Sequence, residues 1–143
     1  MSFDINQNFA QMDKIDFINN TDGFSKKELE ESYRALSSML NKCKKAQEKL
    51  SMEKWQWRLM ESNIRALEIA MPIIINSSDN SFSKNDINEA IKELSSSLDK
   101  TEKIRSKLKL GSSQWTLNKN RTNALKITLF LLSKTLKDDK NLV

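Results

Sequence analysis

The sequence predicts an all-α fold, an antiparallel four-helix bundle made of two tandem helical hairpins. Three observations lead to this prediction. The chain contains an internal repeat at an offset of 58 residues, each copy of the repeat opens with the capping signals of a helix, and the 143 residues include only two Gly and one Pro. Because strands are joined by turns rich in Gly, Pro, Asn and Asp, this scarcity argues against a β-rich fold.

The repeat aligns residues 24–76 with residues 82–134 without a gap, and 18 of the 53 paired positions are identical. A repeat of this length corresponds to one supersecondary unit that cannot bury its own apolar face. Each copy is therefore expected to form a hairpin of two helices, and the two hairpins are expected to bury each other's apolar faces.

The first helix of each hairpin is predicted to begin at a capping box. Ser25 and Glu28 have the spacing of such a box, and Phe24 ahead of the cap can pack on Leu29 as a hydrophobic staple. Residues 82–87 repeat both devices in the second copy. Apolar residues then recur at the spacing of one helix face. In the two copies these are Leu29, Tyr33, Leu36, Leu40, Cys43 and Leu50, then Ile87, Ile91, Leu94, Leu98 and Leu108.

Small and polar residues predict the turns between the paired helices. Gly111 suits the C′ position after the first helix of the second hairpin, and Ser112 or Ser113 can cap the helix that follows. In the first hairpin Ser51 is expected to be the cap. Pro72 lacks a backbone donor and should kink or end the helix that contains it.

One helical-bundle domain is expected over residues 24–143, preceded by an N-terminal segment, 1–23, that contains a short helix. The domain divides into hairpin repeat 1 at 24–76, a polar linker at 77–81, hairpin repeat 2 at 82–137 and a frayed tail at 138–143. Because hairpins can also pair between two chains, the oligomeric state stays open and includes a domain-swapped dimer.

The sequence lacks the residues on which most catalytic and metal sites depend. It has no His, and Cys43 is its one cysteine, which excludes a structural zinc site and an intrachain disulfide. Ser51 and Lys54 match a loose Ser-x-x-Lys pattern, but a helix cap explains Ser51 better. We therefore expect a protein that is not an enzyme, with no catalytic residues, no metal and no cofactor. Cys43 lies on the apolar stripe, where we expect a buried thiol.

The N-terminal residues show no basic segment followed by an apolar one, as a secretory signal would. The longest apolar run, residues 70–75, is far shorter than a membrane span. Together with the single cysteine, these features predict a cytoplasmic protein.

Positive charge is concentrated in two segments. Residues 42–58 carry a net charge of +4 and residues 100–121 a net charge of +6, whereas the whole chain carries +5. Because an up-down-up-down bundle brings both hairpin tips to one end, we expect a single basic pole there. Helix dipoles favour cations near the ends of the first helices. They do not explain cations expected in the first turns of the second helices.

Those first-turn cations are the principal candidates for contact with an anionic or protein partner, and five neighbouring residues extend the candidate site. The cations are Lys54, Arg58, Lys119 and Arg121, and the neighbours are Trp55, Lys45, Lys49, Lys107 and Lys109.

The tryptophans divide into two kinds. Trp57 and Trp115 occupy equivalent positions of the repeat, and we expect both to fill the core near the basic end. Trp55 has Ser113 at the equivalent position and points to a different helix face. It either is exposed, where it would suit a binding surface, or covers the end of the bundle.

These features favour a non-catalytic protein-interaction module, a small adaptor, inhibitor or regulator that acts through surface contacts. The alternative is a nucleic-acid-binding protein that uses the basic pole, since the pI is about 9.3. A third hypothesis is a protein attached to anionic membranes, such as an immunity-type protein against a membrane-active toxin.

Overall fold

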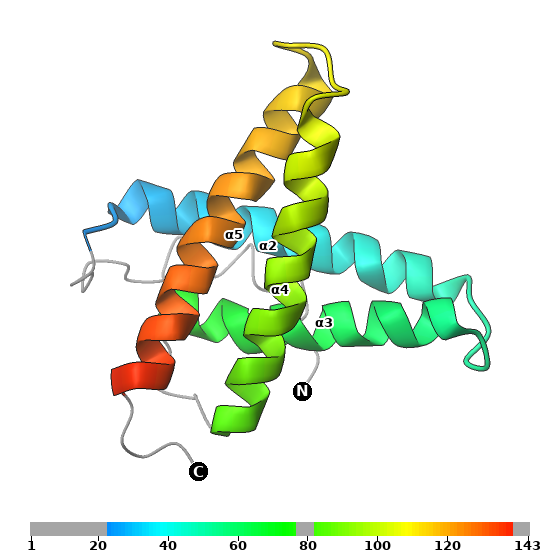
Figure 1. Ribbon diagram of the computed structural model, residues 1–143, viewed down its shortest axis with the longest axis horizontal. Helices are drawn as coiled ribbons and strands as arrows, with labels where there is room; N and C mark the ends of the chain where they lie inside the picture. The colour runs from blue at the N-terminus through cyan, green and yellow to red at the C-terminus, as the bar shows by residue number, and fades with distance from the viewer. Residues whose placement is uncertain (1–22, 77–81, 139–143) are drawn as a thin grey trace.

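The computed structural model describes residues 23–76 and 82–138, which form four α-helices (Figure 1). They are α2 (Lys26–Glu48), α3 (Trp55–Ile74), α4 (Lys84–Arg105) and α5 (Ser113–Asp138). The described residues contain no strand. The predicted short N-terminal helix, the linker at 77–81 and the end of the tail lie outside the described residues.

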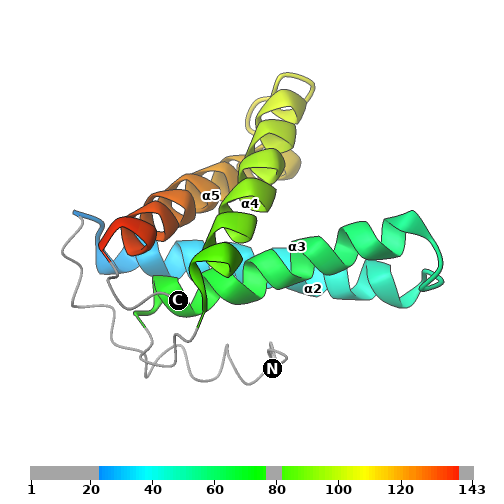
Figure 2. The same ribbon diagram turned by 60° about the horizontal axis from the view of Figure 1, so that its bottom comes forward.

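The helices pair into two antiparallel hairpins, α2 with α3 and α4 with α5, as predicted. Between the hairpins, α2 contacts α5 and α3 contacts α4, while α3 and α5 also meet, which gives the contacts of a four-helix bundle. The hairpins are not aligned along their whole length. They cross, and the tips of the two hairpins point in different directions and lie apart (Figures 1 and 2).

Both predicted capping boxes are present. The Ser25 hydroxyl accepts a hydrogen bond from the Glu28 N–H at 3.0 Å, and the Glu28 carboxylate accepts one from the Ser25 N–H at 3.0 Å. Ser83 and Asp86 make the same two bonds at the start of α4. These local devices fix where the first helix of each hairpin begins.

The two tip turns differ from their predicted form. α3 begins after Lys54, which makes no side-chain cap, and the Ser51 hydroxyl accepts only the Glu53 N–H, at 3.4 Å, within the turn. The prediction that Ser51 caps the helix is therefore wrong. Gly111 has the expected positive φ of 82°, but α4 ends at Arg105, too early for Gly111 to be its C′ residue.

Three further residues lie at the start of α5 and near the end of α3. Ser112 caps α5, because its hydroxyl accepts the Trp115 N–H at 3.2 Å. Pro72 lies inside α3, which continues to Ile74. Asn76 follows with a φ of 52°, the left-handed conformation that commonly ends a helix.

The core lies where the roots of the hairpins cross. Its buried apolar residues come from the first half of α2, the second half of α3, the first half of α4 and the later turns of α5. They include Leu29, Tyr33, Leu36, Leu40, Ile64, Leu67, Ile69, Met71, Ile74, Ile87, Leu94, Leu125 and Leu132.

Two threonines on the apolar face of α5 are buried as well. The Thr122 hydroxyl donates to the Asn118 carbonyl oxygen at 2.9 Å, and the Thr128 hydroxyl donates to the Ala124 carbonyl oxygen at 2.6 Å. Since each hydroxyl is satisfied within its own helix, threonine can replace an apolar residue on this face.

An ion pair connects the hairpin roots. The Arg65 Nη2 atom of α3 lies 2.8 Å from the Asp86 Oδ1 atom of α4. The Ser83 backbone N–H and the Arg65 guanidinium both stabilise the charged form of this carboxylate, so the pKa of Asp86 lies below its ordinary value.

We predict that truncating a core side chain lowers the free energy of unfolding far more than truncating a side chain at a hairpin tip. Leu67→Ala removes a side chain that is 2% exposed and should lower the free energy of unfolding by about 2–5 kcal/mol. Leu110→Ala alters a side chain that is 78% exposed and should change that free energy by no more than about 0.5 kcal/mol. Urea unfolding measures both, and similar losses would contradict the position of the core.

We also predict an acid-dependent stability that comes from Asp86. A carboxyl group with a lowered folded-state pKa stabilises the fold above its unfolded pKa of about 3.9, and this stabilisation is lost as the pH falls through the folded-state value. Asp86→Asn should therefore be less stable than the native protein at pH 7, and the difference should shrink on acidification.

Thermal unfolding between pH 7 and pH 2 measures this effect. Arg65→Met is the companion variant: it removes one cause of the lowered pKa and keeps the Ser83 N–H, so it should show an intermediate dependence. A stability difference between Asp86→Asn and the native protein that stays constant with pH would be the contrary result.

Candidate functional site

Beyond the crossing, each hairpin continues as a pair of helices on which no other helix of residues 23–76 and 82–138 lies (Figures 1 and 2). We call residues 41–63 arm 1 and residues 95–117 arm 2. No residue of either arm is buried, whereas each root supplies buried residues to the core. A two-helix arm cannot bury its own apolar side chains. The arms are therefore the part of the described molecule whose apolar side chains stay at least partly accessible to solvent.

Composition distinguishes the arms from the rest of the chain. Arm 1 holds six basic and three acidic residues, and arm 2 holds five basic and two acidic residues, so each arm carries a net charge of +3. With a chain total of +5, everything outside the arms sums to −1. All three tryptophans of the protein also lie in the arms.

Polar side chains hold the two helices of arm 1 together. The Gln47 Nε2 atom of α2 donates to the Glu61 Oε2 atom of α3 at 2.9 Å and to the Trp57 carbonyl oxygen at 3.5 Å. Nearer the core, the Lys44 Nζ atom lies 3.8 Å from the Glu68 Oε2 atom. These bridges position the tip without a buried apolar layer.

In arm 2, a connected set of hydrogen bonds holds α4 and α5 together. The Asn118 side chain at its base donates to the Thr101 carbonyl oxygen at 2.8 Å and accepts from the Arg105 Nε atom at 3.1 Å. On the outer side of α5, the Lys119 Nζ atom lies 5.5 Å from the centre of the Trp115 ring, a cation–π contact.

Each tip exposes large apolar side chains among its basic residues. Met52 and Trp55 at the tip of arm 1 are 69% and 68% exposed, which settles the question left open for Trp55. Ile104 and Leu110 are exposed at the tip of arm 2. Trp57 and Trp115 are half-buried and do not belong to the core, so the prediction that they fill it is wrong.

The predicted basic residues do not form one pole. Because the hairpins cross, the two tips lie apart in both views (Figures 1 and 2). Arm 1 carries Lys45, Lys49, Lys54 and Arg58, and arm 2 carries Lys107 and Lys109, all of them exposed. α5 begins at Ser113, so Lys119 and Arg121 lie beyond its first turn, contrary to the prediction.

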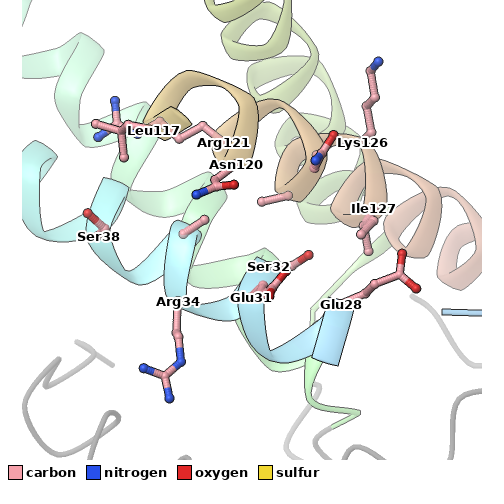
Figure 3. Close-up of a pocket in the computed structure, with 13 residues that line it drawn as sticks. Glu28, Glu31, Ser32, Arg34, Ser38, Leu117, Asn120, Arg121, Lys126 and Ile127 are labelled. Atoms are coloured by element: carbon pink, nitrogen blue, oxygen red, sulfur yellow. The ribbon is translucent and has the colours of Figure 1, made fainter. Parts of the chain in front are cut away.

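Arg121 lies away from the tips, in a groove between α2 and α5 near the root. The groove has a cavity volume of about 670 Å³ and is lined on α2 by Glu28, Glu31 and Arg34 among others, and on α5 by Leu117, Asn120, Arg121 and Lys126 among others. Leu117 and Arg121 lie at one end of the groove and Glu28 at the other (Figure 3). No sequence pattern predicts this groove, because its two walls come from different hairpins.

The Arg121 side chain is half-buried and under-satisfied. Its Nε and Nη2 atoms are inaccessible to solvent and have no hydrogen-bond partner among the residues that the structure describes. Burial lowers the pKa of the Arg121 guanidinium. A buried N–H without an acceptor costs free energy, more so on a charged group, so this side chain needs an explanation beyond packing.

Cys43 packs against the core but is only partly buried, whereas the sequence predicted a buried thiol, and it lies near enough to Arg121 to interact with its charge. Burial raises the pKa of its thiol, and the Arg121 charge opposes this rise. The part of the chain that the structure describes contains no group of three or more His, Cys, Asp or Glu residues placed to hold a metal ion. None of its helices is long and apolar enough to cross a membrane.

Comparison of the chain with known protein families, with curated proteins and with solved structures finds no match. The arguments for function therefore come from the arms and the groove themselves.

We predict that Arg121→Met raises the pKa of the Cys43 thiol above its value in the native protein, because it removes the nearby positive charge and keeps the burial. The rate of alkylation by iodoacetamide as a function of pH measures the thiol directly, since Cys43 is the one cysteine of the chain. Lys126→Met removes a charge elsewhere on the same groove and is the matched control. Equal thiol pKa values in native and Arg121→Met protein would contradict the proximity of the two groups.

Proposed function

We propose that the protein is a non-catalytic interaction module that grips an acidic partner protein with its two arms. The observation that carries the proposal is that neither arm buries a residue, although the arms contain every tryptophan of the chain. Tryptophan is strongly enriched among the residues that dominate protein–protein binding energy. Side chains such as Trp55 and Met52 have apolar area that a partner would remove from water.

The charge of the arms supports an acidic partner. At each tip, exposed apolar side chains lie among exposed lysines. Basic residues at the rim of an interface speed association with an acidic surface. Apolar anchors at the centre and charges around them match the usual arrangement of such interfaces.

Two separated arms support a bivalent mode of binding. Because the core joins both arms in one molecule, engagement of the first arm raises the effective concentration of the second arm at its own contact site. Affinity then depends on the distance between two contact sites as well as on each contact.

Nucleic acid and anionic membrane are the alternative partners. Exposed lysines also suit phosphate backbones, and an exposed tryptophan can stack on a base or enter a lipid headgroup layer. The division of the positive charge between two tips argues against a continuous track along a nucleic-acid strand.

The test uses tagged protein purified from its native cells, with and without nuclease, at moderate salt. Three variants accompany the native chain: Met52→Ser with Trp55→Ala in arm 1, Ile104→Ser with Leu110→Ser in arm 2, and Phe130→Ala as a control. Phe130 is also exposed, but it lies on α5 outside both arms and contacts the Phe24 ring at 5.4 Å.

We predict a protein partner that survives nuclease treatment and is retained by the control but lost from both arm variants. For the purified pair, Trp55→Ala alone should cost about 2 kcal/mol or more, a weakening of roughly thirty-fold, as expected for a binding hot spot. Retention of the same partner by both arm variants would refute the proposal. Recovery of nucleic acid alone, or co-sedimentation with anionic vesicles without a protein partner, would replace it with the corresponding alternative.

A further inference from the structure

The groove between α2 and α5 contains a feature that the arms do not explain. Of the four side-chain atoms that are buried without a hydrogen-bond partner among the described residues, two belong to Arg121. These atoms, Nε and Nη2, carry N–H bonds that point the same way from one edge of the guanidinium plane. Such an edge forms two parallel hydrogen bonds with the oxygens of a carboxylate or phosphate group.

We propose that this groove is a binding site for a small carboxylate- or phosphate-bearing molecule, whose oxyanion is held by the Nε–Nη2 edge of Arg121. The cavity volume of about 670 Å³ falls within the range of small-molecule sites. A bound oxyanion would satisfy both N–H groups and neutralise a half-buried charge, which the described residues leave without a hydrogen-bond partner at these two atoms.

The other residues of the groove define where the anion sits. Arg34 and Lys126 extend out of the groove in opposite directions, whereas Asn120 lies between the two helices (Figure 3). The Asn120 amide can donate a further hydrogen bond to an oxyanion at this end. Leu117, 39% exposed, lines the same end of the groove as Arg121 (Figure 3). Since the Nε and Nη2 atoms are inaccessible in the free protein, side chains at this end have to shift when the ligand binds.

The acidic residues of the groove restrict the ligand. Glu28 and Glu31 line the end away from Arg121, where they would repel a second anionic group. A compact anion at the Arg121 end therefore fits, and a long polyanion that runs along the whole groove does not.

The test measures thermal unfolding of the full chain in Tris chloride, with inorganic phosphate or succinate added and with sodium chloride at equal ionic strength as the reference. We expect a saturable rise in Tm with phosphate, succinate or both. Comparison of the phosphate and succinate titrations identifies which oxyanion the site binds. Binding to the folded state alone raises Tm in this way.

Three variants assign the effect to Arg121. Arg121→Met should abolish the rise in Tm and, without added anion, should unfold at a Tm equal to or above that of the native protein, because an apolar side chain replaces a buried unpaired charge. Arg121→Lys keeps the charge but lacks the two-donor edge and should bind at least about tenfold more weakly. Lys126→Met removes an outward-pointing charge and should respond like the native protein.

Alkylation of Cys43 gives a second readout. An anion on Arg121 cancels the charge that favours the Cys43 thiolate, so saturating ligand should slow the reaction with iodoacetamide at fixed pH. If neither anion raises Tm above the chloride reference, or if Arg121→Met and the native protein respond equally, the proposal is wrong. These results leave the arm proposal untouched, because its variants lie outside the groove.

Discussion

The structure depends on one constraint: the apolar face of each helical hairpin can be buried only by the other hairpin. Where the roots cross, side chains such as Leu36 and Leu67 from one hairpin and Leu94 and Leu125 from the other exclude water. Small buried residues, among them Ala66, Ala70, Ala90 and Ala124, let the helices approach closely at the crossing. Burial of this apolar area supplies the main favourable term in folding.

The same constraint produces the arms. Because the hairpins cross instead of running alongside each other, the far halves contain no buried residue, and polar bridges such as Gln47 to Glu61 hold the helices together there. The exposed tryptophan and methionine of arm 1 are thus a consequence of the crossing. Exposed apolar side chains of this kind are unfavourably solvated in the free protein, and their burial against a partner would be favourable.

The sequence predicted where the first helix of each hairpin begins and which helices pair, but not the form of the two tip turns or the angle between the hairpins. Ser25 and Ser83 depend on partners three residues away, so their capping boxes could be read from the chain alone. The apolar periodicity likewise predicted which face of each helix is buried. The angle between the hairpins is not encoded in that periodicity, since ridges and grooves on the same apolar face allow both aligned and crossed packing.

The errors in the candidate site follow from that angle. An aligned bundle would have gathered Lys54, Arg58, Lys119 and Arg121 at one end. The crossed arrangement separates the tips and leaves Arg121 in the groove, beside a helix of the other hairpin. The exposure of Trp55 and the half-burial of Trp57 could not be predicted for the same reason: both depend on whether a third helix covers the arm.

The most direct test of this account is hydrogen–deuterium exchange of the isolated protein, resolved by peptide. Amides in helices open locally with a free energy that reflects the packing around them. The account predicts slow exchange in the roots, residues 29–40, 64–74, 87–94 and 122–132, and markedly faster exchange in residues 41–63 and 95–117. Equal protection along the full length of all four helices would mean that the arms are packed in the free protein, and would contradict the central claim.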